Sequence, residues 1–195
     1  MPHCPDAPSP DEGVTEGELL LIEYTQVKDE QKARIGFRDN LLYATFAAMA
    51  AVIAATLQGP VRVGLLLLLP PVCLVLGWTY LVNDEKISAI GRYVSTELTP
   101  RLAAVTPLRQ EAFGWEAAHR SDRRRRSRKW LQLFVDLLTF CGTSMAALTV
   151  FWATGPISAA LLAVSLIECA VIVVLAFQIS AYADLSSGGH THRTE

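Results

Sequence analysis

Two acidic residues stand in otherwise apolar surroundings, and they are the first candidates for chemistry. Glu168 lies near the centre of the apolar stretch 157–183, and Asp136 lies about two turns into the stretch 130–153. An ionised carboxylate in hydrocarbon is costly, so such a residue is protonated, paired with a cation or in contact with water. We therefore consider each acid as a proton or cation site or as a pore-lining residue. A neutral acid that is hydrogen-bonded to a neighbouring helix is the structural alternative.

The densest charge in the chain is a basic run that ends directly before Trp130. Apart from Asp122 and Ser residues it consists of seven basic residues, Arg120, Arg123, Arg124, Arg125, Arg126, Arg128 and Lys129. Attraction to anionic lipid is worth roughly 1 kcal/mol for each basic residue near a membrane surface. We expect the run to bind anionic inner-leaflet head groups, with a cytoplasmic protein or a nucleotide as the alternative partner. Nucleic acid is not expected, because no nucleic-acid-binding fold accompanies the run.

Signatures of enzymes are missing from the sequence. It has no phosphate-binding loop, no dinucleotide-binding glycine pattern and no Ser/His/Asp set at a usable depth. The cysteines, Cys4, Cys73, Cys141 and Cys169, do not show the close Cys/His spacing of a zinc site. We therefore predict a protein that is not an enzyme and that binds neither a metal nor a cofactor.

Four apolar stretches without Lys or Arg must position these residues. They cover 41–57, 63–82, 130–153 and 157–183. Each holds about 17 or more mostly apolar residues, which is the length that a helix needs to cross the hydrocarbon core of a bilayer. The sequence therefore predicts an all-α integral membrane protein with four transmembrane helices, arranged as two helical hairpins, 41–82 and 130–183, that are joined by a cytoplasmic helical segment.

The distribution of basic residues predicts how these helices face. Of the 17 Lys and Arg residues, four precede the first apolar stretch, eleven lie in 83–129 and one lies in the tail, so only Arg62 is on the other side. Basic residues are retained on the cytoplasmic side of a membrane. Both termini and the segment 83–129 are therefore expected in the cytoplasm. The excess of Arg over Lys, 13 against 4, is typical of a GC-rich bacterial genome, so we expect a bacterial cytoplasmic membrane.

The first part of the chain divides into two segments. Residues 1–15 are rich in Pro, Asp and Glu and are predicted to be disordered. Residues 16–40 are predicted to form a cytoplasmic amphipathic helix, because apolar residues recur at three- or four-residue steps. No Gly–Pro break precedes the first span, so this helix is expected to enter the bilayer continuously. It either rests against the cytoplasmic middle segment, which we favour, or forms a coiled coil with another subunit.

Prolines mark two further positions. Pro70 and Pro71 lie within the second apolar stretch and predict a kink that could act as a hinge. The segment 83–129 is predicted to be helical and basic, with Pro100 interrupting its helix. The tail, 184–195, is rich in Gly, Ser and His and is predicted to be flexible.

Small residues line two of the predicted spans. Ala47, Ala51 and Ala55 repeat every four residues in the first span, and Gly142 and Ala146 do so in the third. Small residues let helices approach closely in lipid. We expect the alanine face to pack within the chain and the protein as a whole to form a homo-oligomer.

The stretch EYTQVKDEQKARIGFRDN, residues 23–40, is followed by an apolar span. It resembles the SLATT-type and Pycsar-type membrane effectors of bacterial immunity, in which a cytoplasmic helix with a similar Glu/Lys/Arg pattern leads into a two-span hairpin. The resemblance covers residues 18–83, and the second hairpin, 130–183, departs from the two-span pattern. It implies an oligomeric, membrane-disrupting or pore-forming effector that a cytoplasmic signal controls.

Three functions are therefore open from the sequence. The first is a non-enzymatic, oligomeric membrane effector or channel-like protein controlled from the cytoplasm. The second is a small proton-coupled transporter that uses Glu168. The third is a regulatory membrane subunit that holds a cytoplasmic partner.

The predicted orientation has a direct test in a background without the native cysteines. A membrane-impermeant maleimide should label cysteines introduced at Pro60 and Gly155 from outside intact cells, because the outward connections are short and basic residues are excluded from them. It should not label cysteines at Ser121 and Ser187. External labelling at Ser187 would contradict the even number of spans.

Overall fold

A computed structural model of the chain describes residues 14–58, 60–105, 125–155 and 158–183. Every regular element in these ranges is helical. Four helices are long and apolar enough to cross a membrane, and they cover Glu16–Thr56, Val63–Val105, Lys129–Thr154 and Ala159–Tyr182. The chain is therefore an all-α, multi-pass membrane protein, as the apolar stretches predict.

The first helix, α1 (Glu16–Thr56), is a single element of 41 residues. At about 1.5 Å per residue it is roughly 60 Å long, which is twice the thickness of a hydrocarbon core. Its start is a capping box, in which the Thr15 hydroxyl accepts a hydrogen bond from the Glu18 N–H and the Glu18 carboxylate accepts one from the Thr15 N–H. The helix continues through Gly36 into the apolar stretch without a break.

The second long helix changes its winding along its length. It begins as a tightly wound 3₁₀ stretch, η1 (Pro60–Leu68), and continues as α2 (Leu69–Tyr93). Pro70 and Pro71 occupy the first turn of α2. A proline costs little there, because the first N–H groups of a helix lack partners within the helix in any case.

The expected interruption at Pro100 is wrong. A short π-helical turn, η2 (Val94–Leu98), follows α2, and the helix then runs on through Pro100 as α3 (Thr99–Val105). Proline has no N–H to donate to the preceding turn. In this helix both the N–H and the hydroxyl of Thr99 donate to the Val94 carbonyl instead, the hydroxyl at 2.8 Å. The wider turn therefore lets the helix pass the proline.

The last two helices are shorter. The third consists of α5 (Arg125–Asp136), a π-helical turn η3 (Leu137–Gly142) and α6 (Thr143–Thr154). The fourth, α7 (Ala159–Tyr182), begins at Ser158, whose side chain accepts the Leu161 N–H. A Cβ atom on Gly155 would lie 2.6 Å from the Phe151 carbonyl oxygen, so the exposed Ser158 is a better position than Gly155 for an introduced labelling cysteine.

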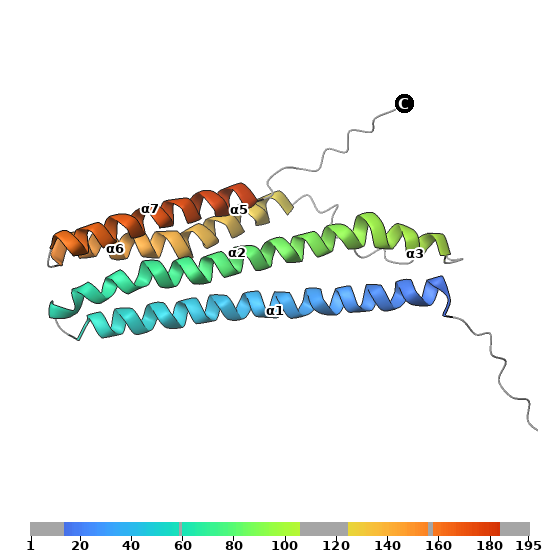
Figure 1. The fold of residues 1–195 in the computed structure, drawn as a ribbon, viewed down its shortest axis with the longest axis horizontal. Helices are drawn as coiled ribbons and strands as arrows, with labels where there is room; N and C mark the ends of the chain where they lie inside the picture. The colour runs from blue at the N-terminus through green and yellow to red at the C-terminus, as the bar shows by residue number, and fades with distance from the viewer. Residues whose placement is uncertain (1–13, 59, 106–124, 156–157, 184–195) are drawn as a thin grey trace, which may run out of the picture.

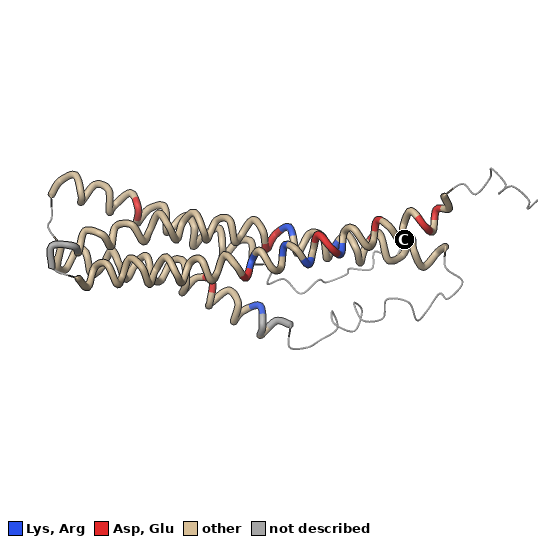
Figure 2. The backbone as a smooth tube through the Cα atoms, turned by 90° about the horizontal axis from the view of Figure 1, so that it is seen from below, with Lys and Arg blue, Asp and Glu red and all other residues tan. Residues whose placement is uncertain are grey.

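The helices form an elongated bundle with α2 at its centre (Figure 1). The α2 helix packs along α1 on one side and against α6, η3 and α7 on the other. The main core cluster joins all four spans through Leu41, Tyr80, Phe140 and Ile172. Lys, Arg, Asp and Glu gather toward one half of the bundle (Figure 2). The apolar region of the bundle has two ends. We call the end next to this half the charged end. We call the opposite end, at Leu57 and Gly155, the loop end.

The expectation that the alanine face packs within the chain is wrong for two of its three residues. Ala47 and Ala51 are exposed, and Ala55 is half-buried. The helix α1 contacts the bundle mainly through the second long helix, so only one of its faces is covered. Leu41 and Thr45 lie on that covered face. The alanine face therefore points away from the rest of the chain.

Gly77 tests the closest packing of α2. A Cβ atom there would lie 2.9 Å from the Phe140 ring and 3.2 Å from Leu175, whereas one on Gly36 would meet nothing within 4 Å. We expect Gly77→Ala to lower the free energy of unfolding by about 1–3 kcal/mol through overpacking. Gly36→Ala, the control, should raise it by up to about 1 kcal/mol, because alanine favours a helix. Thermal unfolding in detergent, followed by tryptophan fluorescence, measures both, and equal stability of the two variants would contradict this packing.

Candidate functional site

A cleft of about 340 Å³ opens at the charged end of the bundle. Its walls come from α1, α2, α5 and α7, and they combine charged, hydroxyl, amide and aliphatic side chains. Its volume lies at the lower end of the range for small-molecule sites. The cleft brings together ionisable side chains from four helices that are separated in the sequence.

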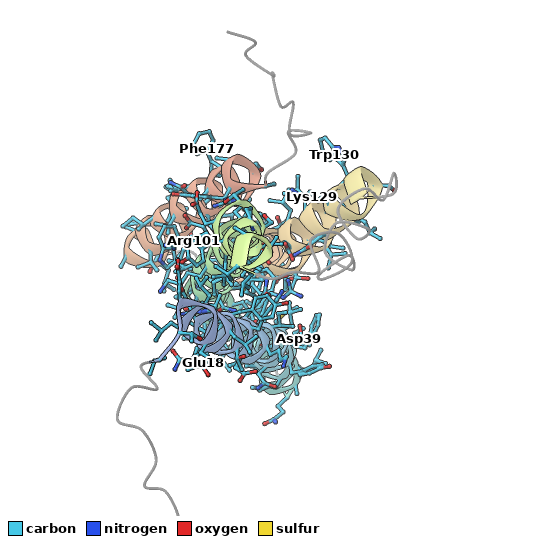
Figure 3. The ribbon with its side chains drawn as sticks, turned by 90° about the vertical axis from the view of Figure 1, so that its right-hand side faces the viewer. Glu18, Asp39, Arg101, Lys129, Trp130 and Phe177 are labelled. Carbon is cyan, nitrogen blue, oxygen red and sulfur yellow. The ribbon has the colours of Figure 1, made fainter. Side chains whose placement is uncertain are left out.

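The cleft exists because α5 leans away from α2. The helix α5 packs on the end of α7, and its contact with α2 is slight. Figure 3 looks along the bundle from this side and shows Lys129 and Trp130 on α5, standing apart from α2 and α3 in the centre. The π-helical turn η3 follows α5 directly, and such turns redirect a helix axis. The space left between α5 and α2 is the cleft.

The wall that α2 supplies is a regular series. Tyr80, Asp84, Ser88 and Arg92 all line the cleft. They are spaced by four residues, so they lie on one helix face, each about 6 Å farther along the axis than the one before. The series therefore runs from a buried tyrosine to an exposed arginine.

Polar contacts join α1 to α2 beside the cleft. The Arg38 guanidinium donates to the Asp84 carboxylate at 2.9 Å, and the side chains of the pair are 25 % and 35 % exposed. One turn away, the amide of Asn83 donates to the Arg34 carbonyl oxygen at 2.7 Å, and Asn83 is buried. A hydrogen bond between charged groups contributes about 1.5–3 kcal/mol when shielded from water, and partial exposure reduces this. These contacts set the register between the two long helices.

The deep end of the cleft holds Asp136 and Tyr80. They are 8 % and 5 % exposed. The Gln132 amide donates to the Tyr80 hydroxyl at 3.4 Å, and the Tyr80 ring packs on Phe140 with ring centres 5.4 Å apart. In the described part of the chain no salt bridge reaches Asp136. The structure therefore places this predicted acid on the inner wall of the cleft.

The outer end of the cleft is basic. Arg92 from α2 is exposed, and Lys129 from α5 is half-buried. The neutral side chains Ser88, Gln132 and Tyr182 also line the cleft. They carry hydroxyl or amide groups that can donate hydrogen bonds. The outer end therefore presents basic groups and hydrogen-bond donors to the cleft.

Only one side chain of the predicted basic run can be placed at this site. Lys129 lines the cleft. The backbone of Arg125, Arg126 and Arg128 belongs to α5. The remaining members, Arg120, Arg123 and Arg124, lie outside the described residues, and so do the tail, 184–195, and residues 1–13 of the predicted disordered start, 1–15. The last residue of that start, Thr15, is ordered as the N-cap of α1.

Glu168 lies elsewhere. It is half-buried on α7, and its Oε2 atom is shielded from solvent without a hydrogen-bond partner among the described residues. It precedes Ile179, the first α7 residue that lines the cleft, by eleven positions, or roughly 16 Å along the helix. The nearby Ser165 hydroxyl is used by the Trp152 indole, which donates to it at 2.9 Å. The two predicted acids are therefore separate features, and the roles of Glu168 and of the Pro70–Pro71 hinge stay predictions.

Sequence reasoning missed most of the cleft. The sequence analysis used Arg38 and Arg92 only as basic residues that predict orientation. It did not identify Tyr80, Asp84 or Gln132 as site residues. The four-residue series on α2 was the available signal. That series alone could not predict a cleft, because the opposite wall is formed by α5, about fifty positions later in the chain.

The described residues contain no group of three or more His, Cys, Asp or Glu side chains that could hold a metal ion. Comparisons with protein-family models, curated proteins and solved structures found no match to this chain. The fold and the cleft thus define a helical membrane protein with four candidate spans and a polar cleft at the charged end.

Proposed function

We propose that this chain is a non-enzymatic, oligomeric membrane effector or channel-like protein controlled from the cytoplasm. One observation carries the proposal. The two helices α1 and α2–α3 run without interruption from the apolar region into the charged half of the bundle, packed against each other. A change at their far ends can therefore act mechanically on the spans.

The proposal assigns the charged half to the cytoplasm of a bacterial cell. The distribution of Lys and Arg supports this assignment. The chain then forms two hairpins with both termini in the cytoplasm, and the residues 16–40 and 83–105 make a paired stalk beyond the membrane. At about 1.5 Å per residue the stalk extends roughly 35 Å. It is in the right place to receive a cytoplasmic signal, as in the effectors that residues 23–40 resemble.

The stalk has its own packed core. Val94 and Leu98 are fully buried against Leu20, and Tyr24 and Val27 pack around them. The Tyr93 hydroxyl also donates to the Glu23 carboxylate. Close-packed interiors transmit displacements with little compression. The core therefore supports a stalk that moves as a unit and passes its motion to the first two spans.

The outer face of α1 supports self-association. Ala47 and Ala51 are exposed between larger exposed residues such as Tyr43 and Phe46. Small residues in lipid let two helices approach closely and gain van der Waals contact. A pore would then form between copies, since the interior of one bundle is occupied by its own core clusters.

The proposal is tested with the full chain reconstituted into dye-loaded vesicles. Leu98→Asp puts a charge into the stalk core, where Leu98 is 0 % exposed, and should release the spans from their resting arrangement. We expect dye or ion flux to rise about tenfold, because coupling free energies between sites typically change an equilibrium by about 5- to 150-fold. Leu19→Asp is the matched control, because Leu19 is 57 % exposed on the same stalk.

The oligomer is measured in the same preparations. We expect wild type, Leu98→Asp and Leu19→Asp to share one size above the monomer in mild detergent and in nanodiscs. A monodisperse monomer in both, together with flux from Leu98→Asp that does not exceed that of Leu19→Asp and wild type, would falsify the proposal.

A proton-coupled transporter that uses Glu168 is the second candidate. The observation that favours it is the shielded Oε2 atom of Glu168 without a partner in the described structure. An acid in that setting either gains a proton or meets a transported cation. The half-buried position on α7 gives it a route to the surface of the bundle.

Two substitutions separate these roles. Glu168→Gln keeps the hydrogen-bonding capacity and removes titration, so a transport or pore role predicts loss of flux at unchanged expression and oligomer size. A structural role predicts a nearly silent Gln variant and a less stable Glu168→Leu variant, because leucine cannot hydrogen-bond. Normal flux and normal thermal stability in both variants would remove Glu168 from the mechanism.

A further inference from the structure

Two adjacent prolines remove hydrogen-bond donors inside the apolar part of the second long helix. A carbonyl oxygen normally accepts from the N–H three residues later in a 3₁₀-helix and four residues later in an α-helix. For Leu67, near the end of η1, both of those positions are prolines, Pro70 and Pro71, which have no N–H. The Leu67 carbonyl oxygen therefore lacks both helical donors, and a carbonyl that lacks a donor is costly in apolar surroundings.

Glu168 lies beside this proline pair. The helices α2 and α7 run in the same direction, from the loop end to the charged end (Figure 1). Gly77 and Leu175 face each other, because a Cβ atom on Gly77 would lie 3.2 Å from the Leu175 side chain. Pro70 precedes Gly77 by seven residues, or about two turns, and so lies on the same face of α2. Glu168 precedes Leu175 by the same seven residues on α7. Pro70 and Glu168 are therefore at the same level, on facing sides of the two helices.

Burial agrees with this placement. Pro70 is less than 2 % exposed. Leu67 is buried in the same core cluster as Cys169, the residue that follows Glu168. The Glu168 Oε2 atom is shielded from solvent and has no hydrogen-bond partner among the described residues. An acidic oxygen and a carbonyl oxygen thus share one apolar part of the bundle.

Neighbouring polar groups do not serve these two oxygens. The Ser165 hydroxyl, one turn before Glu168, donates to the Leu162 carbonyl oxygen at 2.9 Å and accepts from the Trp152 indole at 2.9 Å. In the part of the chain that the structure describes, no salt bridge reaches Glu168. A carboxylate and a carbonyl are both acceptors, so a proton or a cation has to lie between them.

We propose that the Glu168 carboxylate and the Leu67 carbonyl oxygen are ligands of a small monovalent metal cation, sodium or potassium. Carbonyl oxygens of interrupted helices, together with acidic side chains, suit such ions inside membranes. One carboxylate balances one positive charge, whereas a divalent ion would leave an uncompensated charge in apolar surroundings. Water that reaches the half-buried Glu168 supplies the remaining ligands. The site gives the transporter candidate its ion and in that respect rests on it, but binding is measured without any flux.

Thermal unfolding of the full chain in detergent, followed by tryptophan fluorescence, tests the site. Sodium chloride or potassium chloride replaces choline chloride at constant ionic strength, so that general screening stays fixed. A ligand that binds only the folded state raises the unfolding temperature as its concentration passes the dissociation constant. We expect this rise for at least one of the two ions. Glu168→Gln should weaken the apparent affinity at least about tenfold, because it removes the charge that balances the ion.

A second variant acts on the other ligand. Pro70→Ala combined with Pro71→Ala returns both N–H groups to the helix, so the Leu67 carbonyl oxygen regains its helical donors and is no longer free for a cation. We expect higher thermal stability in choline chloride, together with an affinity for the ion that is at least about tenfold weaker. If Glu168 is only a neutral, hydrogen-bonded acid, wild type shows no response to either ion, and the proposal is wrong.

Glu97→Gln and Pro100→Ala are the matched controls. Both residues lie on the second long helix outside the apolar stretches, so both variants should keep the response of wild type. If Glu97→Gln weakens the response as much as Glu168→Gln does, the ion is held by general surface charge and the site is wrong. A larger response to calcium than to either monovalent ion at equal ionic strength would overturn the monovalent assignment.

Binding and transport can fail separately. Ion binding that depends on Glu168, in a chain that gives no flux, would leave this site standing and count against the transporter candidate alone. Flux that depends on Glu168, without any response of the unfolding temperature to sodium or potassium, would overturn this site alone.

Discussion

Peptide groups in the apolar part of this bundle have no water to bond with, and the remaining architecture follows from that constraint. An unpaired N–H or C=O in hydrocarbon costs several kcal/mol, so each span must be a continuous helix. The chain keeps that continuity even where its sequence works against it. Side-chain hydroxyls follow the same rule, since Thr45 donates to the Leu41 carbonyl at 2.7 Å and Ser144 donates to the Phe140 carbonyl at 2.8 Å. Polar side chains can therefore lie inside spans without neighbours from other helices.

Departures from regular winding occur where the molecule needs a change of direction. The π-helical turn after Tyr93 carries the second helix past Pro100, and the one after Asp136 separates the leaning α5 from the packed α6. Each widens the helix by one residue and so rotates the faces that follow it. The second of these turns lies between α6, which packs against α2, and α5, whose contact with α2 is slight, and the cleft lies between α5 and α2.

The helix α2 carries the interactions that organise the others. Near the core it presents Gly77, which lets Phe140 and Leu175 approach its backbone. At the boundary of the apolar region it presents Asn83 and Asp84, which bind α1. Farther along it presents Arg92 to the cleft. A single helix therefore joins the spans, the stalk and the candidate ligand site, and this gives a physical basis for coupling among them in the function that we propose.

The sequence alone determined the class of this protein, because length and hydropathy are properties of each segment by itself. Four apolar runs predicted four helices, and the uninterrupted pattern from residue 16 predicted one helix that enters the first span. The acids at 136 and 168 were identifiable for the same reason, since a charge in an apolar run costs energy in any arrangement.

Neighbours were decided only in three dimensions. Periodicity showed that Ala47 and Ala51 share a face, but it could not show that α2 covers the opposite face and leaves theirs exposed. Hydropathy placed Asp136 and Glu168 in spans, but only the packing of α5 and α7 showed that Asp136 lines the cleft and Glu168 does not. The cleft unites Arg38, Arg92 and Lys129 from three helices that are distant in sequence. A repeating pattern reports the orientation of one helix about its own axis, whereas a site depends on how several such axes pack together.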